Sequence, residues 1–327
     1  VARMKLLWKS LALVLGAVVF FSGAAVVATW APDQTVQALS VRWANAPSRF
    51  VPVGPLSVHL RDEGPRSPPG AEAPLPLVLL HGTSASLHTW DGWVAALGRE
   101  RRVIRFDLPG FGLTGPDPAH DYRIDRYAQF VLATLDQLGV RRFALAGNSL
   151  GGQIAWTTAL AAPDRVAALV LVDASGYPLE LDRSSDNVPI GFRIAATPGL
   201  NRVMEWTLPR GLVESSVRNV YGDPTKVTPQ LVDRYFELTL REGNRAALAH
   251  RLQQGYTGPV ERLPEIRQPT LILWGGRDRL IPVAMAHRFA RDIPGSRLVV
   301  FDDLGHVPHE EDPPRTAEAV RGFLAGR

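Results

Sequence analysis

The stretch Phe143-Ala-Leu-Ala-Gly-Asn-Ser-Leu-Gly-Gly-Gln-Ile-Ala-Trp156 changes character at Ser149, because an apolar run typical of a strand ends just before it and a helical pattern follows. A strand that turns directly into a helix strains the residue at its apex and leaves no room for side chains two positions away on either side. Gly147 and Gly151 occupy those two positions. The resulting G-x-S-x-G elbow exposes the hydroxyl of Ser149, our candidate nucleophile. It also points the N–H of Leu150 into the same space, as one donor of an oxyanion hole.

Short apolar runs on both sides of the elbow have the length and composition of buried strands. Five of them lie at residues 77–80, 103–106, 167–172, 269–274 and 297–301. Stretches with helical spacing lie between or after them, among them residues 123–138, 284–293 and 314–324. Strands that alternate with helices predict an α/β fold, a mostly parallel central sheet flanked by helices on both faces.

Polar residues that follow three of these strands complete a hydrolytic site with Ser149. A serine hydroxyl is a weak nucleophile until a base removes its proton, and the imidazole that does so must be held in one tautomer. Asp278 and His306 each lie just past a strand, so the chain order is Ser, Asp, His, as expected for a triad on such a sheet. The N–H of Thr83, with Ser84 as the alternative, lies in a glycine-containing loop after another strand and is the second predicted oxyanion donor.

Other residues compete for these roles. Asp173 also follows a strand and is the alternative acid, but the Ala-Ser-Gly behind it is typical of a turn that a carboxylate caps. His309 is the alternative base, although a proline restrains its loop whereas a glycine precedes His306. Asp107 heads a turn rich in glycine and proline, so we expect it to bind backbone N–H groups. For His81 we likewise expect a structural role.

Residues 177–263 interrupt the alternation of strands and helices with helix-like pieces, prolines and glycines. We interpret them as a helical cap that lies over the catalytic edge of the sheet. Aromatic side chains in and near this segment predict an apolar substrate pocket, with packing inside the cap as the alternative role for each of them. The candidate lining residues are Trp90, Phe192 and Trp206.

The amino-terminal segment predicts a membrane helix. Arg3, Lys5 and Lys9 precede an uncharged, apolar stretch over residues 10–32, which is long enough to cross a bilayer. The alternative is a cleaved signal peptide, whose apolar region is usually shorter. Both interpretations export the rest of the chain, because the positive charges stay on the cytoplasmic side. The expected layout is 1–32 signal anchor or signal peptide, 33–52 linker, 53–176 first part of the core, 177–263 cap and 264–327 second part of the core.

Composition narrows the class of protein. Hydrophobic residues make up 46% and charged residues 21% of the 327-residue chain, which is ordinary for a globular protein with a sizeable core. The net charge of +4 comes from scattered arginines without a basic stripe, so we expect no nucleic-acid partner. The absence of cysteine excludes disulfides, thiolate metal sites and cysteine nucleophiles. We expect no cofactor and no metal, because the predicted chemistry is complete without them, and the sequence leaves the oligomeric state open.

Five motifs give the chain a resemblance to the α/β-hydrolase superfamily from about residue 50 to residue 326. They are His81-Gly-Thr, Asp107-Leu-Pro-Gly-Phe-Gly, Gly147-Asn-Ser-Leu-Gly-Gly152, Gly275-Gly-Arg-Asp278 and Leu304-Gly-His306. Relatives of this outline include carboxylesterases, lipases, haloperoxidases without cofactor and carbon–carbon bond hydrolases. Those with an aspartate nucleophile, the epoxide hydrolases and haloalkane dehalogenases, do not match Ser149. The carbon–carbon hydrolases carry Trp directly after the catalytic His, where this chain has Val307.

The resemblance therefore implies a serine hydrolase with an acyl-serine intermediate. We expect it to cleave carboxylic esters of small or medium apolar acyl groups, near a membrane or in an exported compartment. The alternative within the superfamily is carbon–carbon hydrolysis of a diketone-like substrate. An alternative of another class is a binding module that keeps the fold without catalysis.

Overall fold

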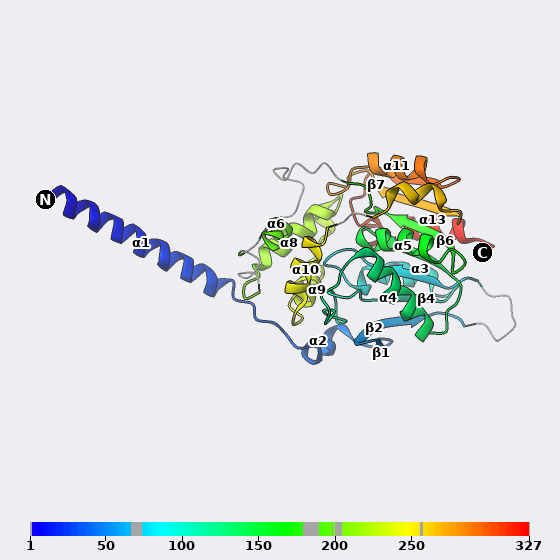
Figure 1. The fold of residues 1–327 in the computed structure, drawn as a ribbon, viewed down its shortest axis with the longest axis horizontal. Helices are drawn as coiled ribbons and strands as arrows, with labels where there is room; N and C mark the ends of the chain where they lie inside the picture. The colour runs from blue at the N-terminus through cyan, green and yellow to red at the C-terminus, as the bar shows by residue number, and fades with distance from the viewer. Residues whose placement is uncertain are drawn as a thin grey trace.

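The apolar runs of the chain form the centre of one sheet (Figure 1). The computed structural model describes residues 2–66, 74–178, 190–197, 199, 205–255 and 258–326. Within these residues, eight strands lie in the order β1-β2-β4-β3-β5-β6-β7-β8. Their bounds are β1 Arg49–Val53, β2 Leu56–Glu63, β3 Leu77–Leu80, β4 Val103–Phe106, β5 Phe143–Asn148, β6 Val166–Val172, β7 Thr270–Gly275 and β8 Arg297–Phe301. The pairs β1–β2 and β2–β4 are antiparallel and the others are parallel, so the predicted mostly parallel sheet is confirmed.

Side chains of the central strands alternate between two apolar layers. In β3, Leu77 and Leu79 pack against α3 and α13, whereas Val78 and Leu80 face the layer of α4, α5 and α11. Burial on both faces explains why these strands are apolar throughout. The helices are α3 Asp91–Leu97 behind the 3-10 turn η1 Leu87–Trp90, α4 Ile124–Gln137, α5 Leu150–Ala161, α11 Ala284–Asp292, α12 Pro308–Glu311 and α13 Pro313–Leu324.

The segment between β6 and β7 is helical, as the cap interpretation predicts. Its elements are α6 Ile190–Ala196, α8 Arg210–Val220, η2 Pro224–Lys226, α9 Pro229–Thr239, α10 Asn244–Gln253 and η3 Val260–Glu265. In Figure 1 its α-helices gather at one edge of the sheet, on the side from which α1 extends. Parts of the predicted cap, at residues 179–189, 198, 200–204 and 256–257, lie outside the described residues.

The amino-terminal segment forms a long helix, α1 (Ala2–Ala28), which projects away from the rest of the chain in Figure 1. Among the described residues, however, no helix is both long and apolar enough to cross a membrane. The predicted membrane-spanning helix is therefore not supported.

The segment expected to be a linker or a short helix contains both a short helix and an edge strand. It contains α2 (Val36–Trp43) and β1, whose first residue pairs with Leu60 of β2. The indole Nε1 of Trp43 donates to Glu237 Oε2 at 2.7 Å, and Arg245 pairs with Asp33 at 2.6 Å. This segment has no strong hydrophobic period because much of its stability comes from contacts with the cap rather than from a wide apolar face of its own.

Candidate active site

The turn at Ser149 has the geometry that its glycines predict. Ser149 adopts a φ of 54° and a ψ of −116°, a strained conformation at the junction of β5 and α5. A Cβ atom on Gly147 would lie 2.1 Å from the carbonyl oxygen of Gly151, and one on Gly151 would lie 2.3 Å from that of Leu80. Both approaches involve backbone atoms, so only glycine fits at either position.

His306 and Asp278 lie side by side past the ends of β8 and β7. His306 Nδ1 is 2.7 Å from Asp278 Oδ2, and both side chains are almost fully buried. The other carboxylate oxygen, Oδ1, accepts the N–H groups of Leu280 at 2.7 Å and Ile281 at 2.9 Å. These contacts fix the carboxylate, which in turn leaves His306 Nε2 as the free ring nitrogen.

Backbone contacts hold the loop of His306 between the elbow and the cap. The His306 N–H donates to the Val220 carbonyl at 2.8 Å, and Asn148 Nδ2 donates to the His306 carbonyl at 2.9 Å. Glu311 Oε2 accepts the N–H groups of Gly305 and Gly222, each at 2.8 Å. Sequence reasoning did not single out these positioning residues, although Asn148 lies inside the elbow motif.

The two predicted oxyanion donors lie next to the elbow. Leu150 is the first residue of α5, so its N–H has no acceptor within the helix. Thr83 lies in the loop after β3, and this loop lies directly against the elbow, since a Cβ on Gly82 would be 3.2 Å from Ser149 Cβ. Thr83 and Ser149 both line the same cavity.

This cavity has a volume of about 920 Å³ and lies between the sheet edge and the cap. Ser149 and His306 line it on the side of the sheet. Apolar side chains form much of the remaining wall, among them Phe192, Leu208, Leu212, Val217, Leu252 and Met285. Of the three predicted pocket residues, the structure places only Phe192 in the wall.

Trp90 and Trp206, the other two predicted pocket residues, do not line the cavity. Trp90 is fully buried in the core, where its ring lies 4.0 Å from that of His309. Trp206 is 57% exposed and stacks on Trp30 with ring centroids 5.7 Å apart. The side to which an aromatic ring turns depends on its packing partners, which the sequence does not reveal.

The competing base, His309, and the other candidate histidine, His81, have partners away from the cavity. The ring of His309 is buried, its Nε2 is 3.0 Å from Thr89 Oγ1, and burial lowers its pKa well below the usual range. His81 is also buried, and its Nε2 accepts the N–H of Leu108 at 2.9 Å. Neither residue lines the cavity, whereas His306 does.

Asp107 has the structural role expected for it. Its carboxylate accepts the N–H groups of Leu87 at 2.7 Å and Leu113 at 2.8 Å and lies 2.7 Å from His59 Nδ1. Burial alone would raise the pKa of Asp107, but the His59 ring and these surroundings bring it below its ordinary value. The other nitrogen of His59 is 2.9 Å from Ser48 Oγ, so this chain of contacts ties the amino-terminal segment to the core.

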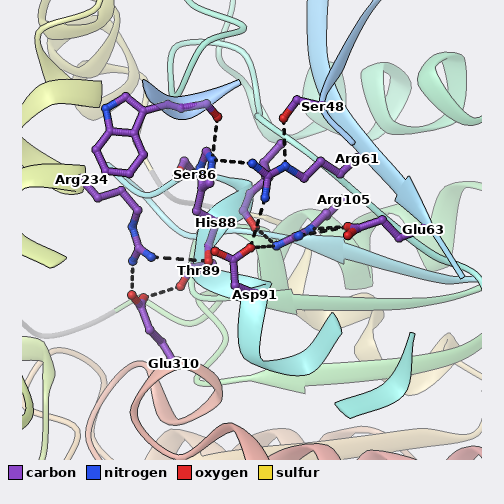
Figure 2. Close-up of polar contacts among 12 residues, drawn as sticks. Ser48, Arg61, Glu63, Ser86, His88, Thr89, Asp91, Arg105, Arg234 and Glu310 are labelled. Atoms are coloured by element: carbon purple, nitrogen blue, oxygen red, sulfur yellow. Dashed lines mark hydrogen bonds and ion pairs between the residues drawn. The ribbon is translucent and has the colours of Figure 1, made fainter. Parts of the chain in front are cut away.

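A buried polar network fastens the cap to the core close to His306 (Figure 2). Arg234 of α9 forms an ion pair with Glu310, which follows the catalytic loop. Thr89 and Tyr235 donate to the same carboxylate. The network therefore joins a cap helix, the turn η1 and α12 at one point.

Among the described residues, one group has the spacing of metal ligands. One atom each of Asp173, Asp278 and His306 lies within 4.8 Å of the others. Asp278 Oδ2 and His306 Nδ1, however, are hydrogen-bonded to each other at 2.7 Å. This is the geometry of a carboxylate that orients an imidazole. This arrangement can orient the imidazole of His306 and stabilise its charged form, and His306 lines the same cavity as Ser149.

Comparison with known proteins agrees with this geometry. A family model described as alpha/beta hydrolase fold matches residues 76–313. The chain belongs to the α/β-hydrolase family. A 2-hydroxy-6-oxo-2,4-heptadienoate hydrolase of Pseudomonas putida is 30% identical and aligns with 85% of this α/β hydrolase and 96% of the relative. The uncharacterized hydrolase YugF of Bacillus subtilis is 29% identical over 76% of this chain and 89% of its own.

A solved structure matches this α/β hydrolase along its whole length. It is a membrane phospholipase A described as a bacterial virulence factor, with 26% identity and a TM-score of 0.71. The match covers 100% of this chain and 99% of that one, so it includes the amino-terminal helix. The family and its hydrolase relatives show the fold and support hydrolysis as the reaction class.

Proposed function

We propose that this α/β hydrolase cleaves carboxylic esters of apolar acyl groups through an acyl-Ser149 intermediate. The observation that carries the proposal is the cavity of about 920 Å³ that Ser149 and His306 line together with many apolar side chains. An acyl chain buries its methylene groups against such a wall, each with a gain of about 0.8 kcal/mol. The ester carbonyl then lies beside the elbow.

In the proposed reaction His306 acts as base and then as acid, Ser149 is the nucleophile, and the other residues of the site orient or stabilise charge. Ser149 Oγ attacks the ester carbon while His306 Nε2 takes its proton, and Asp278 stabilises the imidazolium that forms. The N–H groups of Thr83 and Leu150 receive the developing oxyanion. His306 then gives the proton to the leaving alcohol, and a water activated by the same nitrogen releases the acid.

Relatives support two substrate classes. The full-length match to a membrane phospholipase A favours an acyl ester, in agreement with the apolar cavity. The 30% identical heptadienoate hydrolase of Pseudomonas putida favours cleavage of a carbon–carbon bond next to a ketone, which is the second candidate. Val307, which lines the cavity directly after His306, differs from the Trp that the family resemblance associates with that second chemistry.

The test is hydrolysis by the full chain in detergent of p-nitrophenyl esters of graded acyl length, a phospholipid and a 2-hydroxy-6-oxo-dienoate. We expect an optimum at a medium or long acyl chain, and a loss of at least about 10³-fold in kcat for Ser149→Ala. Ser216→Ala is the matched control, because Ser216 also lines the cavity but donates to the Leu212 carbonyl on α8. If the chain turned over only the dienoate, carbon–carbon cleavage would replace ester cleavage as the proposed function. A folded chain that turns over none of these substrates would favour a binding module.

We also propose that the chain is attached to a membrane through α1, with the catalytic domain on the exported side. Leu13, Leu15 and Val27 of this helix are between 64% and 78% exposed, so α1 presents apolar side chains to its surroundings. Exposed apolar surface of this extent is typical of a segment that contacts lipid. We expect the full chain to sediment with lipid vesicles, residues 33–327 to stay in solution, and the membrane-bound chain to be digested by protease added from the exported side. Release into the supernatant would contradict the proposal.

A further inference from the structure

A second carboxyl group, Asp173, lies beside the triad and has no part in the reaction described above. Asp173 follows β6, the strand next to β7, whose end carries the loop of Asp278. Its N–H donates to the Leu273 carbonyl at 3.0 Å, and its Oδ1 accepts the N–H of Gly275 at 2.9 Å. The side chain is completely buried. Asp173 is therefore built into the start of the loop that presents Asp278.

The second oxygen of Asp173 faces an unusual environment. Oδ2 is buried and has no donor among the residues that the structure describes. An oxygen of Asp173 lies within 4.8 Å of an oxygen of Asp278 and a nitrogen of His306. Burial and mutual repulsion disfavour ionisation of both carboxyl groups, and Asp278 already accepts two N–H groups and the His306 ring. The proton therefore belongs on Asp173.

We propose that Asp173 is a positioning residue of the triad, a carboxylic acid that donates a hydrogen bond to the Asp278 carboxylate and so fixes it for His306. The inference rests on the proposed function, because it assigns Asp173 a part in activating Ser149. With this bond both carboxyl oxygens of Asp173 have a partner, and the Asp278 carboxylate is held by four donors.

Two further observations agree with this role. Burial, and then the charge of Asp278, raise the pKa of Asp173 well above the usual range of a carboxyl group. The backbone of Asp173 has a φ of 44°, in the left-handed region that costs free energy for a residue other than glycine. Strain of this kind persists where the surrounding structure holds a group in place for function.

An isosteric and a truncated variant of Asp173 distinguish a role as hydrogen-bond donor from a role in packing alone. Asp173→Asn keeps a donor toward Asp278 and an acceptor for Gly275, and asparagine tolerates a positive φ. Asp173→Gly relieves the φ and removes both contacts. The readout is the rate at which a fluorophosphonate labels Ser149 of the full chain, a reaction in which Ser149 Oγ displaces fluoride from phosphorus and His306 takes the proton. This rate does not depend on knowing the natural substrate.

We expect Asp173→Asn to label within about threefold of the wild-type rate, and Asp173→Gly to label about 10- to 100-fold more slowly. Equal rates for the wild type and the Gly variant would overturn the proposal. Slow labelling of the Asn variant as well would also overturn it, since the negative charge rather than the donor would then matter. A wild-type chain that is not labelled at Ser149 would refute the proposed function itself, so the two failures are distinguishable.

A second comparison keeps the test decisive if the Gly variant does not fold. Asp278→Asn removes the negative charge next to Asp173, so Asp173 can ionise. Its carboxylate then supplies the negative charge that stabilises the protonated His306. We expect the double variant with Asp173→Asn to label about tenfold more slowly than Asp278→Asn alone. Equal labelling of these two isosteric variants would overturn the role of Asp173.

Discussion

Gly275 leaves no room for a side chain between two active-site loops. A Cβ atom there would lie 1.9 Å from the carbonyl oxygen of Gly305 and 2.6 Å from that of Leu304. Both belong to the backbone of the His306 loop, so no rotamer change relieves the clash. We expect Gly275→Ala to displace His306, to lower kcat by about 10²-fold and to lower Tm, because a shift of about 1 Å at a catalytic group has this cost. Ester hydrolysis and thermal unfolding measure both effects.

Gly322 provides the matched control for this substitution. It lies exposed in α13, and a Cβ atom there would meet no atom within 4 Å. Gly322→Ala replaces a poor helix former by the best one, which stabilises an exposed helix by up to about 1 kcal/mol. We expect unchanged kcat and an equal or higher Tm. Normal turnover by Gly275→Ala would show that the two loops do not constrain His306.

Individual residues were predictable from sequence where backbone geometry demanded them. The glycines around Ser149 indicate a turn that no other residue fits. Asp278 and His306 follow strands whose carboxyl ends lie at the same edge of the sheet. Trp90 and Trp206 were not predictable in this way, because a tryptophan is suited equally to a core, a cavity wall and an exposed stack. Tertiary contacts decide among these three environments, and local sequence patterns do not predict such contacts.

Among the elements, those with a strong pattern of their own were predicted and those that depend on partners were not. The strands β3 to β7 are buried on both faces, so continuous apolar runs reveal them. The edge strand β8 is only partly buried, but four of its five residues are apolar, so its run is also visible. Strand β1 lies at the sheet edge with only Val53 buried, and α2 buries only Leu39. Such elements carry too few apolar positions for a period to be visible.

The cap segment after α8 is hydrogen-bonded through Glu311 to the loop that carries His306. Glu311 accepts N–H groups from Gly222 and Asp223 of this segment and from Gly305 of the His306 loop, each at 2.8 Å. A Cβ on Gly222 would lie 2.4 Å from the Asp303 carbonyl, so the two chains are in backbone contact. A displacement of the cap at this edge would therefore move His306, which couples any opening here to loss of the base.

Across the whole molecule, burial keeps several histidines neutral. Burial lowers the pKa of His81 and His309, and it lowers that of His88 to about 3. His88 lies in the network of Figure 2, where its Nε2 donates to the Trp43 carbonyl at 2.9 Å. The cationic side chains of Arg61 and Arg234 also disfavour a positive charge on His88. The folded chain therefore binds fewer protons at these rings than the unfolded chain, whose histidines titrate near 6.5.

This difference in proton binding predicts destabilisation by mild acid. Because the unfolded state binds more protons below a pH of about 6.5, the free energy of unfolding falls as the pH falls from about 6.5 toward the lowered pKa of the folded state. For His88, with a folded pKa of about 3, the loss reaches about 2 kcal/mol at pH 5. Urea unfolding at pH 7.5 and pH 5 measures this loss. We expect the free energy of unfolding of His88→Gln to fall by about 2 kcal/mol less than that of the wild type between these two conditions.

The control is His287→Gln, at an exposed position of α11, which should follow the wild type. An identical pH dependence in His88→Gln and the wild type would mean that His88 protonates in the folded chain, and that the junction between α2, the cap and the core tolerates the added charge.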